Sequence, residues 1–287
     1  MSTPLAFGPL QYDSPVADPP VLYACTVHWH VSRFAAPVPC RTFLVRHGSA
    51  RWSLIDAGCP GCEAALVDAV QSAIGSDGEL AYIFLTHGHL DHTAATNDLL
   101  ARFPTAKVVA HAREVPYLTG ELRYSRTRGS GLLYNITKYL MFESTVRVSR
   151  DRIVAVRGDG DEATESTAEN VLPCDELQAE TGICVLATPG HTPGHAAYLH
   201  VPSRAVFTGD AFMNLVPMFG RSPAITAPLA LSTVSPSSAR ASIRSLLKRH
   251  DWTRAFPAHD AGAITTQGGD MGCGGVSKDA LAVAFPG

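Results

Sequence analysis

The sequence has no long apolar run, and this absence argues against one class of protein. No stretch approaches the roughly 18 uninterrupted apolar residues that a membrane helix requires. The amino terminus also lacks a basic region followed by an apolar core, which is the pattern of a secretory signal. We therefore expect no membrane partner and a cytoplasmic location.

An excess of positive charge is also absent. The 287 residues include 23 Lys and Arg against 26 Asp and Glu, which gives a formal charge of -3. A protein that binds nucleic acid over a broad surface needs a basic excess, because much of its affinity comes from phosphate contacts. The charge balance predicts no nucleic-acid partner. We expect a small-molecule substrate instead, and the sequence also allows a homodimer.

Cysteine is infrequent, with seven in the chain. This odd number fits a reducing compartment better than a disulfide framework. Cys59 and Cys62 have a spacing that suits a redox disulfide or half of a zinc site, but no second closely spaced pair completes four ligands. We favour a turn into the following helix with two small apolar side chains.

Histidine and aspartate concentrate in the sequence HGHLDH at positions 87–92, directly after an apolar run. Neutral imidazole and ionised carboxylate are ligands of borderline divalent metals, and so many polar groups are costly to bury without a cation. Residues two apart in an extended segment share a face, so His87 and His89 can point at one ion. Asp91 and His92 can then face a neighbouring position as the chain turns.

Three further motifs carry the same residue types, and each follows a short apolar run. They are PGHTPGH at 189–195, TGD at 208–210 and PAHD at 257–260. A single His-x-His is common by accident. Four separate clusters make a shared metal site the better interpretation.

Together with Asp56 in the sequence LIDAG, these motifs resemble those of the metallo-β-lactamase-fold hydrolase superfamily over roughly residues 40 to 262. The resemblance implies an α/β fold, the four-layer αββα sandwich, here with a helical insertion. It also implies two divalent metal ions, with Zn as the first choice and Fe or Mn as alternatives.

The resemblance further implies seven metal ligands. Those of the first ion are His87, His89 and His191, those of the second are Asp91, His92 and His259, and Asp210 bridges the two. A ligating carboxylate keeps a spare lone pair, so Asp91 is the predicted catalytic residue, which holds the nucleophile or shuttles a proton. Asp56 and His195 are expected to orient the ligands through hydrogen bonds from outside the ligand set.

The predicted activity follows from the two ions, which share a water and lower its pKa from about 15.7 to about 7. We expect a dinuclear hydrolase that acts on a lactone, ester or thioester carbonyl of an apolar acyl substrate. The apolar character rests on candidate pocket residues, which are Trp29, Phe34, Phe212, Met213, Met218, Phe219, Tyr134 and Tyr139. A short similarity to acyl-homoserine lactonases points the same way, although Met213 stands where those enzymes usually carry Tyr.

Other activities of related chemistry are alternatives. A mononuclear iron persulfide dioxygenase would use His87, His191 and Asp210. A phosphodiesterase, a β-lactamase and a non-catalytic ligand sensor are less favoured. True metallo-β-lactamases generally lack the bridging Asp, nucleases that process transfer RNA need a basic surface, and a sensor does not need a complete set of ligands.

Hydrophobic periodicity predicts the elements around the motifs. These are strands at 42–46, 52–55, 82–85 and 107–110, and helices at 62–74, through 99–103, and from a Ser235 cap to near 250, after which residues 254–256 lead to His259. Because the ligands are spread along the chain, we expect one domain over 1–287.

Two regions differ from the family pattern. Residues 120–180 resemble the family least and predict an insertion, helical at 132–142, that forms a lid, a substrate wall or an interface. Residues 263–287 are expected to form an irregular tail, with the irregular chain ending at 278–285.

Overall fold

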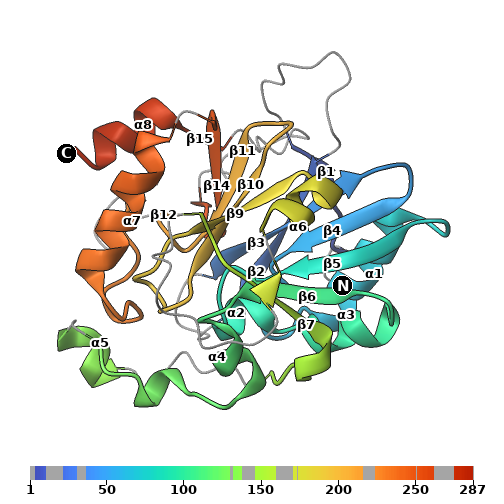
Figure 1. The fold of residues 1–287 in the computed structure, drawn as a ribbon, viewed down its shortest axis with the longest axis horizontal. Helices are drawn as coiled ribbons and strands as arrows, with labels where there is room; N and C mark the ends of the chain where they lie inside the picture. Colours follow the sequence, from blue (N-terminus) through green and yellow to red (C-terminus); the bar gives the residue numbers. More distant parts are fainter. Residues whose placement is uncertain are drawn as a thin grey trace.

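Two β-sheets pack face to face, and helices cover the outer face of each (Figure 1). The computed structural model describes residues 4–10, 22–30, 37–129, 132–137, 146–159, 171–172, 174–215, 224–249, 251–261 and 275–286. Within these residues, α1 and α3 lie on one side of the sheets and α7 and α8 on the other (Figure 1). The predicted αββα sandwich is confirmed.

The strands of the first sheet follow one another in chain order. They are β1 (Gly8–Pro9), β2 (Leu22–Trp29), β3 (Val38–His47), β4 (Arg51–Ile55), β5 (Glu79–Phe84), β6 (Lys107–His111), β7 (Ile153–Val156) and β8 (Val171–Leu172). The first four strands pair antiparallel, and each later strand pairs parallel with its predecessor. The helices along this half are α1 (Glu63–Ile74), α2 (Leu90–Thr93), α3 (Thr96–Arg102), α4 (Val115–Thr119) and α5 (Leu132–Thr137), with short 3-10 helices at Tyr124–Arg126 and Arg150–Arg152.

The second sheet has the order β15-β14-β11-β10-β9. Its strands are β9 (Ile183–Ala187), β10 (Ala196–His200), β11 (Ala205–Gly209), β14 (Arg254–Pro257) and β15 (Val276–Ser277), while β12 (Met213–Leu215) and β13 (Ala224–Thr226) pair separately. The helices of this half are α6 (Cys174–Thr181), α7 (Pro236–Lys248) and α8 (Lys278–Ala284). Across the residues that the structure describes, no helix is both long and apolar enough to cross a membrane.

Aromatic side chains fill the space between the two sheets. Phe43 of β3 lies 4.7 Å from Phe207 of β11, measured between ring centroids, and Phe84 lies 5.1 Å from Tyr198. All four rings are buried, and each contributes about 1.5 to 3 kcal/mol through removal of apolar surface from water. This central layer fixes the two sheets against each other.

Most elements predicted from periodicity are confirmed, and two regions differ. Ile153–Val156, inside the predicted insertion, is a strand of the first sheet, and its four residues are too few to stand out as a pattern. In the carboxy-terminal segment, Lys278–Ala284 forms α8 where the irregular chain is expected to end, and Val276–Ser277 forms the strand β15, which the sequence pattern does not predict. Within the predicted helix 132–142, Leu132–Thr137 is helical, and positions 138–142 lie outside the described residues.

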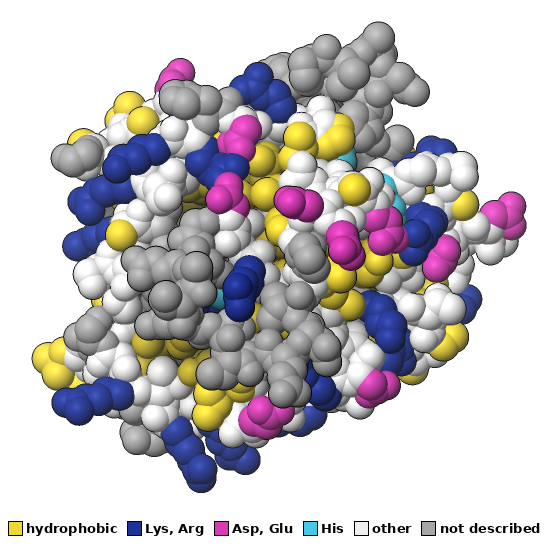
Figure 2. Space-filling view, in the orientation of Figure 1, with side chains coloured by type: hydrophobic (Ala, Val, Ile, Leu, Met, Phe, Trp, Pro, Cys, Tyr) yellow, Lys and Arg dark blue, Asp and Glu magenta, His cyan; other side chains and the backbone are white. Residues whose placement is uncertain are grey.

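Helix α5 presents apolar side chains to solvent. Leu132, Leu133 and Ile136 are exposed, and Figure 2 shows hydrophobic atoms at the lower left, where Figure 1 draws this helix. Tyr134 is buried instead, and its hydroxyl donates to the Tyr124 carbonyl oxygen at 2.8 Å. Asn135 adds a second connection, because its amide donates to the Gly129 carbonyl at 2.7 Å. The helix is therefore tied to the preceding chain by at least two side chains.

Helix α7 begins at a strong cap and docks on the loop after β9. Ser235 accepts the backbone N–H of Ser238, as the sequence predicts for an N-cap. The Ser235 N–H donates to the Gly190 carbonyl at 2.8 Å, and the Ser242 hydroxyl donates to that of Pro189 at 2.7 Å. The helix thus fixes the backbone of a loop that carries a histidine motif.

The close approach of α7 requires glycine at position 190. Gly190 has φ +136, and an added Cβ would lie 2.1 Å from the backbone nitrogen of Ala239. We expect Gly190→Ala to lower the free energy of unfolding by about 3 kcal/mol or more, because backbone must move. Gly75→Ala, at φ +76 and ψ -175 with nothing within 4 Å, meets only backbone strain and should cost less, about 1 to 3 kcal/mol. Equal losses in chemical denaturation would contradict this account of the docking.

Candidate metal centre

Histidine and aspartate side chains from four loops meet at one edge of the two sheets. His87, His89, Asp91 and His92 follow β5, His191 follows β9, Asp210 follows β11 and His259 follows β14. All seven are buried, and Asp91 is the most exposed of them at 7%. The structure therefore brings together every residue that the motifs predict as a ligand.

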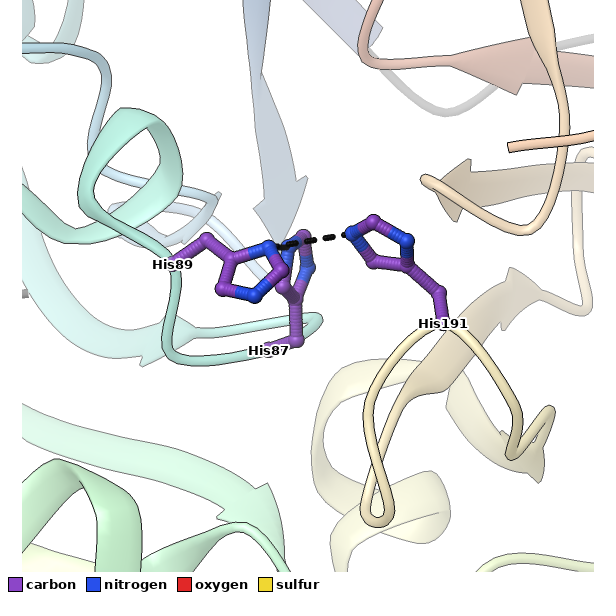
Figure 3. A group of neighbouring side chains, drawn as sticks. All are labelled: His87, His89 and His191. Atoms are coloured by element: carbon purple, nitrogen blue, oxygen red, sulfur yellow. Dashed lines mark hydrogen bonds between the residues drawn. The ribbon is translucent and has the colours of Figure 1, made fainter. Parts of the chain in front are cut away.

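The first group consists of three imidazoles from two loops, which turn toward one another in Figure 3. The Nε2 atoms of His87 and His191 each lie 3.0 Å from Nδ1 of His89. Nitrogen ligands about 2.0 to 2.1 Å from a tetrahedral ion are separated by about 3.3 Å. The three nitrogens are thus close to the spacing that one zinc ion requires.

The second group consists of Asp91, His92 and His259. Asp210 connects it to the first group. His259 Nε2 lies 3.3 Å from Asp91 Oδ2 and 3.4 Å from Asp210 Oδ1. His92 Nε2 also lies 3.4 Å from Asp210 Oδ1. The other oxygen of Asp210 lies 3.3 Å from His191 Nε2. Asp210 therefore has one oxygen toward each group, which is the geometry of a bridging carboxylate.

Four of the imidazoles have their outward nitrogen held by the protein. Their partners are Thr86 Oγ1 for His87 at 3.1 Å, Asp56 Oδ2 for His92 at 2.9 Å, Thr233 Oγ1 for His191 at 3.3 Å and the Pro39 carbonyl for His259 at 2.8 Å. When Nδ1 donates to such a partner, the Nε2 lone pair faces the centre. These contacts fix both the orientation of each ring and the atom that it offers.

Asp56 and His195 lie behind the ligands. Asp56 has a positive φ of 58, and its Oδ1 accepts the backbone N–H of Thr86 at 2.8 Å while Oδ2 faces His92. Nε2 of His195 accepts the backbone N–H of Asp210 at 3.1 Å. Both side chains therefore contact the residues whose orientation they are predicted to set.

Burial sets the protonation of the first group. Desolvation lowers the pKa of His89 to about 4 and that of His191 to about 3. Both imidazoles are therefore neutral at pH 7, which is the form that binds a metal.

For Asp91, burial opposes ionisation, but His92 and His259 outweigh it and lower the carboxyl pKa to about 2.

The donor atoms fit divalent ions. His92 Nε2 and Asp210 Oδ1 are buried, and neither has a hydrogen-bond partner of acceptable geometry within the described part of the chain. Such atoms cost free energy unless a cation or a donor compensates them. The sets His87, His89, His191 and His87, His92, Asp210 each converge closely enough to hold one ion. Nitrogen and carboxylate donors of this kind suit zinc, iron or manganese.

Glu114 is a buried carboxylate that the sequence motifs do not reveal. Its Oε1 accepts the Gly88 N–H at 2.8 Å and the Tyr124 hydroxyl. Its Oε2 accepts the Gly194 N–H at 3.0 Å and the Thr192 hydroxyl at 3.0 Å. One side chain therefore joins the loop of His87 and His89 to the loop of His191.

A second buried connection fixes the last ligand. The guanidinium of Arg41 in β3 pairs with Asp260 at 2.9 Å. The backbone N–H of Arg41 donates to the Ala258 carbonyl at 2.8 Å. These contacts hold the residues on both sides of His259. Cys40, next along β3, places its Sγ 3.9 Å from His259 Nδ1 and is a neighbour that the motifs also miss.

The structure describes some of the predicted pocket residues and not others. Phe212 is buried in the core beside Ile243 and Leu246, Trp29 is half-buried against the first sheet, and Met213 and Tyr134 are buried. The remaining four, Phe34, Tyr139, Met218 and Phe219, lie outside the described residues. The thiols of Cys59 and Cys62 are buried at a turn before α1, where the Cys62 N–H donates to the Cys59 carbonyl at 3.2 Å.

The position of Glu114 predicts an effect on metal affinity. A Gln amide would turn an NH₂ group toward a donor, so we expect Glu114→Gln to weaken zinc binding about 10- to 100-fold. Titration of metal-free protein against a competing chelator measures this. Glu121→Gln, at an exposed carboxylate nearby, is the control and should leave affinity unchanged. A folded Glu114→Gln protein with unaltered affinity would show that the carboxylate does not organise the two loops.

Comparisons with known proteins identify the family of the chain. A model of the metallo-beta-lactamase superfamily matches residues 35–259. The probable metallo-hydrolase YflN of Bacillus subtilis is 32% identical over 165 residues, which are 56% of this chain and 56% of the relative. A hydroxyacylglutathione hydrolase of Brucella anthropi is 28% identical over 148 residues, 51% of this chain and 39% of the relative. The chain thus spans little more than half of the first relative and less than half of the second.

Solved structures share the architecture. The crystal structure of TTHA1623 in a di-iron-bound form aligns with a TM-score of 0.52 and 24% identity, over 88% of this chain and 96% of that one. This likeness shows the fold alone. Because the family model matches most of the 287 residues, the protein belongs to the metallo-β-lactamase superfamily.

Proposed function

We propose that this metallo-hydrolase is a dinuclear enzyme that opens a lactone or cleaves an ester or thioester with an apolar acyl group. The observation that carries the proposal is the convergence of seven buried donors in two groups that share Asp210. The similarity to a hydroxyacylglutathione hydrolase supports an acyl substrate. Zinc is the proposed metal, and the di-iron form of TTHA1623 supports room for two ions in such a fold.

The ligands assign the chemistry that the metals supply. His87, His89 and His191 would hold one ion, and the second group would hold the other. Two divalent ions at such a site make water acidic enough to ionise near pH 7 and polarise a carbonyl oxygen. Neutral imidazoles contribute no negative charge and Asp91 and Asp210 contribute one each, so two divalent ions would keep half of their positive charge for the substrate.

Asp91 is placed to move a proton. Its Oδ2 faces His259 at 3.3 Å, and its Oδ1 lies farther from His92, at 3.9 Å. It is also the most exposed of the seven donors. We assign Asp91 to accept the proton that the attacking water loses and to return it to the oxygen or sulfur that leaves the carbonyl carbon.

The strand after the bridging aspartate lies beside the candidate centre. Met213 begins β12, directly after the Asp210 loop. The Asn214 N–H donates to the His259 carbonyl at 2.9 Å, so β12 lies beside a proposed ligand. A loop that starts at one proposed ligand and returns to another is placed to contact substrate. The Met213 side chain itself is buried and has no hydroxyl, so the activity must proceed without a hydroxyl at that position.

Metal content and substrate range test this proposal together. Protein purified without added metal should contain about two zinc ions per chain and should hydrolyse members of a panel of lactones and thioesters faster than phosphodiesters or β-lactams. One iron per chain with oxygen uptake on a persulfide would instead identify a dioxygenase. Turnover of phosphodiesters alone would disprove the acyl assignment.

Single substitutions separate binding from catalysis. We expect His89→Ala and Asp210→Ala to lose metal and all turnover, because each removes a donor from the centre. Asp91→Asn should keep the fold and lower kcat by about 100-fold or more, since the amide cannot accept the proton. Elemental analysis, circular dichroism and steady-state kinetics measure these effects, with His28→Ala at an exposed imidazole as the control. Full activity and full metal content in Asp210→Ala would rule out the bridging role.

A further inference from the structure

A pair of cysteines lies apart from the metal centre, at the edge of the second sheet. Cys174 is the first residue of α6, and Cys184 lies in β9, the edge strand. Both thiols are free and half-buried. The other free cysteines among the described residues, Cys25, Cys40, Cys59 and Cys62, are at most 4% exposed. This pair is therefore the accessible one.

The two side chains lie on either side of the Val185 peptide, next along β9 from Cys184. The backbone N–H of Val185 donates to the Cys174 sulfur at 3.4 Å, so Cys174 occupies a hydrogen-bonding position at the open edge of β9. The Cys184 thiol donates to the Val185 carbonyl at 3.9 Å. A donor aimed at a sulfur stabilises its thiolate form. The neighbouring Cys184 sulfur is the natural second partner.

A cavity of about 890 Å³ gives solutes access to both sulfurs. Its lining includes Cys174 and Cys184, the cationic side chains of Arg157 and Arg249, and the carboxylates of Asp159, Asp175 and Asp251. Arg249 pairs with Asp159 and Asp251. The interaction with Cys184, followed by the hydrogen bond from Val185, outweighs burial and the charges of Asp175 and Asp159 and lowers the pKa of Cys174 to about 6. The pKa of Cys184 is raised, first by its interaction with Cys174 and then by burial. Cys174 is thus the more readily ionised of the two thiols.

We propose that Cys174 and Cys184 form a peroxide-reactive dithiol site. The Cys174 thiolate attacks one oxygen of a hydroperoxide, so that an S–O bond forms and the O–O bond breaks with release of the other oxygen as water or an alcohol. The Cys184 sulfur then attacks the Cys174 sulfenic acid, an S–S bond forms and water leaves. The two thiols lose two electrons in total, and these reduce the peroxide.

The structure supports the second step as well as the first. A disulfide needs its two sulfurs about 2.05 Å apart, and both side chains here line the same cavity. The bond would link the start of α6 to β9, two elements that already pack together. The site shares no residue with the metal centre, so it does not depend on the proposed hydrolase activity.

Peptide mass spectrometry tests the site. The intact protein is treated with hydrogen peroxide, the remaining thiols are alkylated and the chain is cut with trypsin, which leaves both cysteines in one peptide, 158–204. We expect this peptide to lose the mass of two hydrogens, reversibly on reduction, at least about ten times faster than any buried cysteine reacts. The rate should fall as the pH drops through about 6, because the Cys174 thiolate is then protonated.

Matched variants assign the two roles. In Cys184→Ser, Cys174 should stop as a sulfenic acid that dimedone traps, and in Cys174→Ser, Cys184 should remain a thiol. Cys59→Ser is the control and should leave the reaction of peptide 158–204 unchanged. The proposal is overturned if Cys174 reacts no faster than Cys59 or Cys62 in the folded protein. It is equally overturned if Cys184 oxidises at an undiminished rate in a folded Cys174→Ser protein.

Discussion

Desolvation of the metal-binding side chains is the constraint on which the rest of the structure depends. A buried imidazole or carboxylate loses its hydration, and several kcal/mol are at stake for each ionised group that finds no partner. The protein meets this constraint with hydrogen bonds on the side of each ring that faces away from the centre. Asp56 supports His92, the Pro39 carbonyl supports His259, and the central face of each ring is left for a cation. The same contacts that reduce the cost of burial therefore also aim the ligands.

The local sequence was sufficient to predict those features that depend only on residues close together in the chain. The spacing of His87 and His89 after an apolar strand predicts two ligands on one face, and the structure puts their nitrogens 3.0 Å apart. The Ser235 cap and the apolar positions after it predict α7 within about two residues. These features depend on neighbours in sequence, so hydrophobic period and capping chemistry reveal them.

Features that depend on distant pairs were not predictable in this way. Glu114 follows β6 without any motif, and its partners Gly88 and Gly194 are 26 and 80 positions away. Arg41 reaches across 219 positions to Asp260. A buried charge has no signature in a single sequence until the fold shows what surrounds it. The strand β7 was not predicted for another reason, because its four residues carry too little periodicity.

The division of donors between the two sheets has a consequence for assembly. The first sheet is built in chain order and carries four of the seven donors, while His191, Asp210 and His259 belong to the second. A growing polypeptide therefore completes one half of the centre before the other half exists. Metal bound by donors from both sheets would connect the two halves, and its affinity would report whether they have closed on each other.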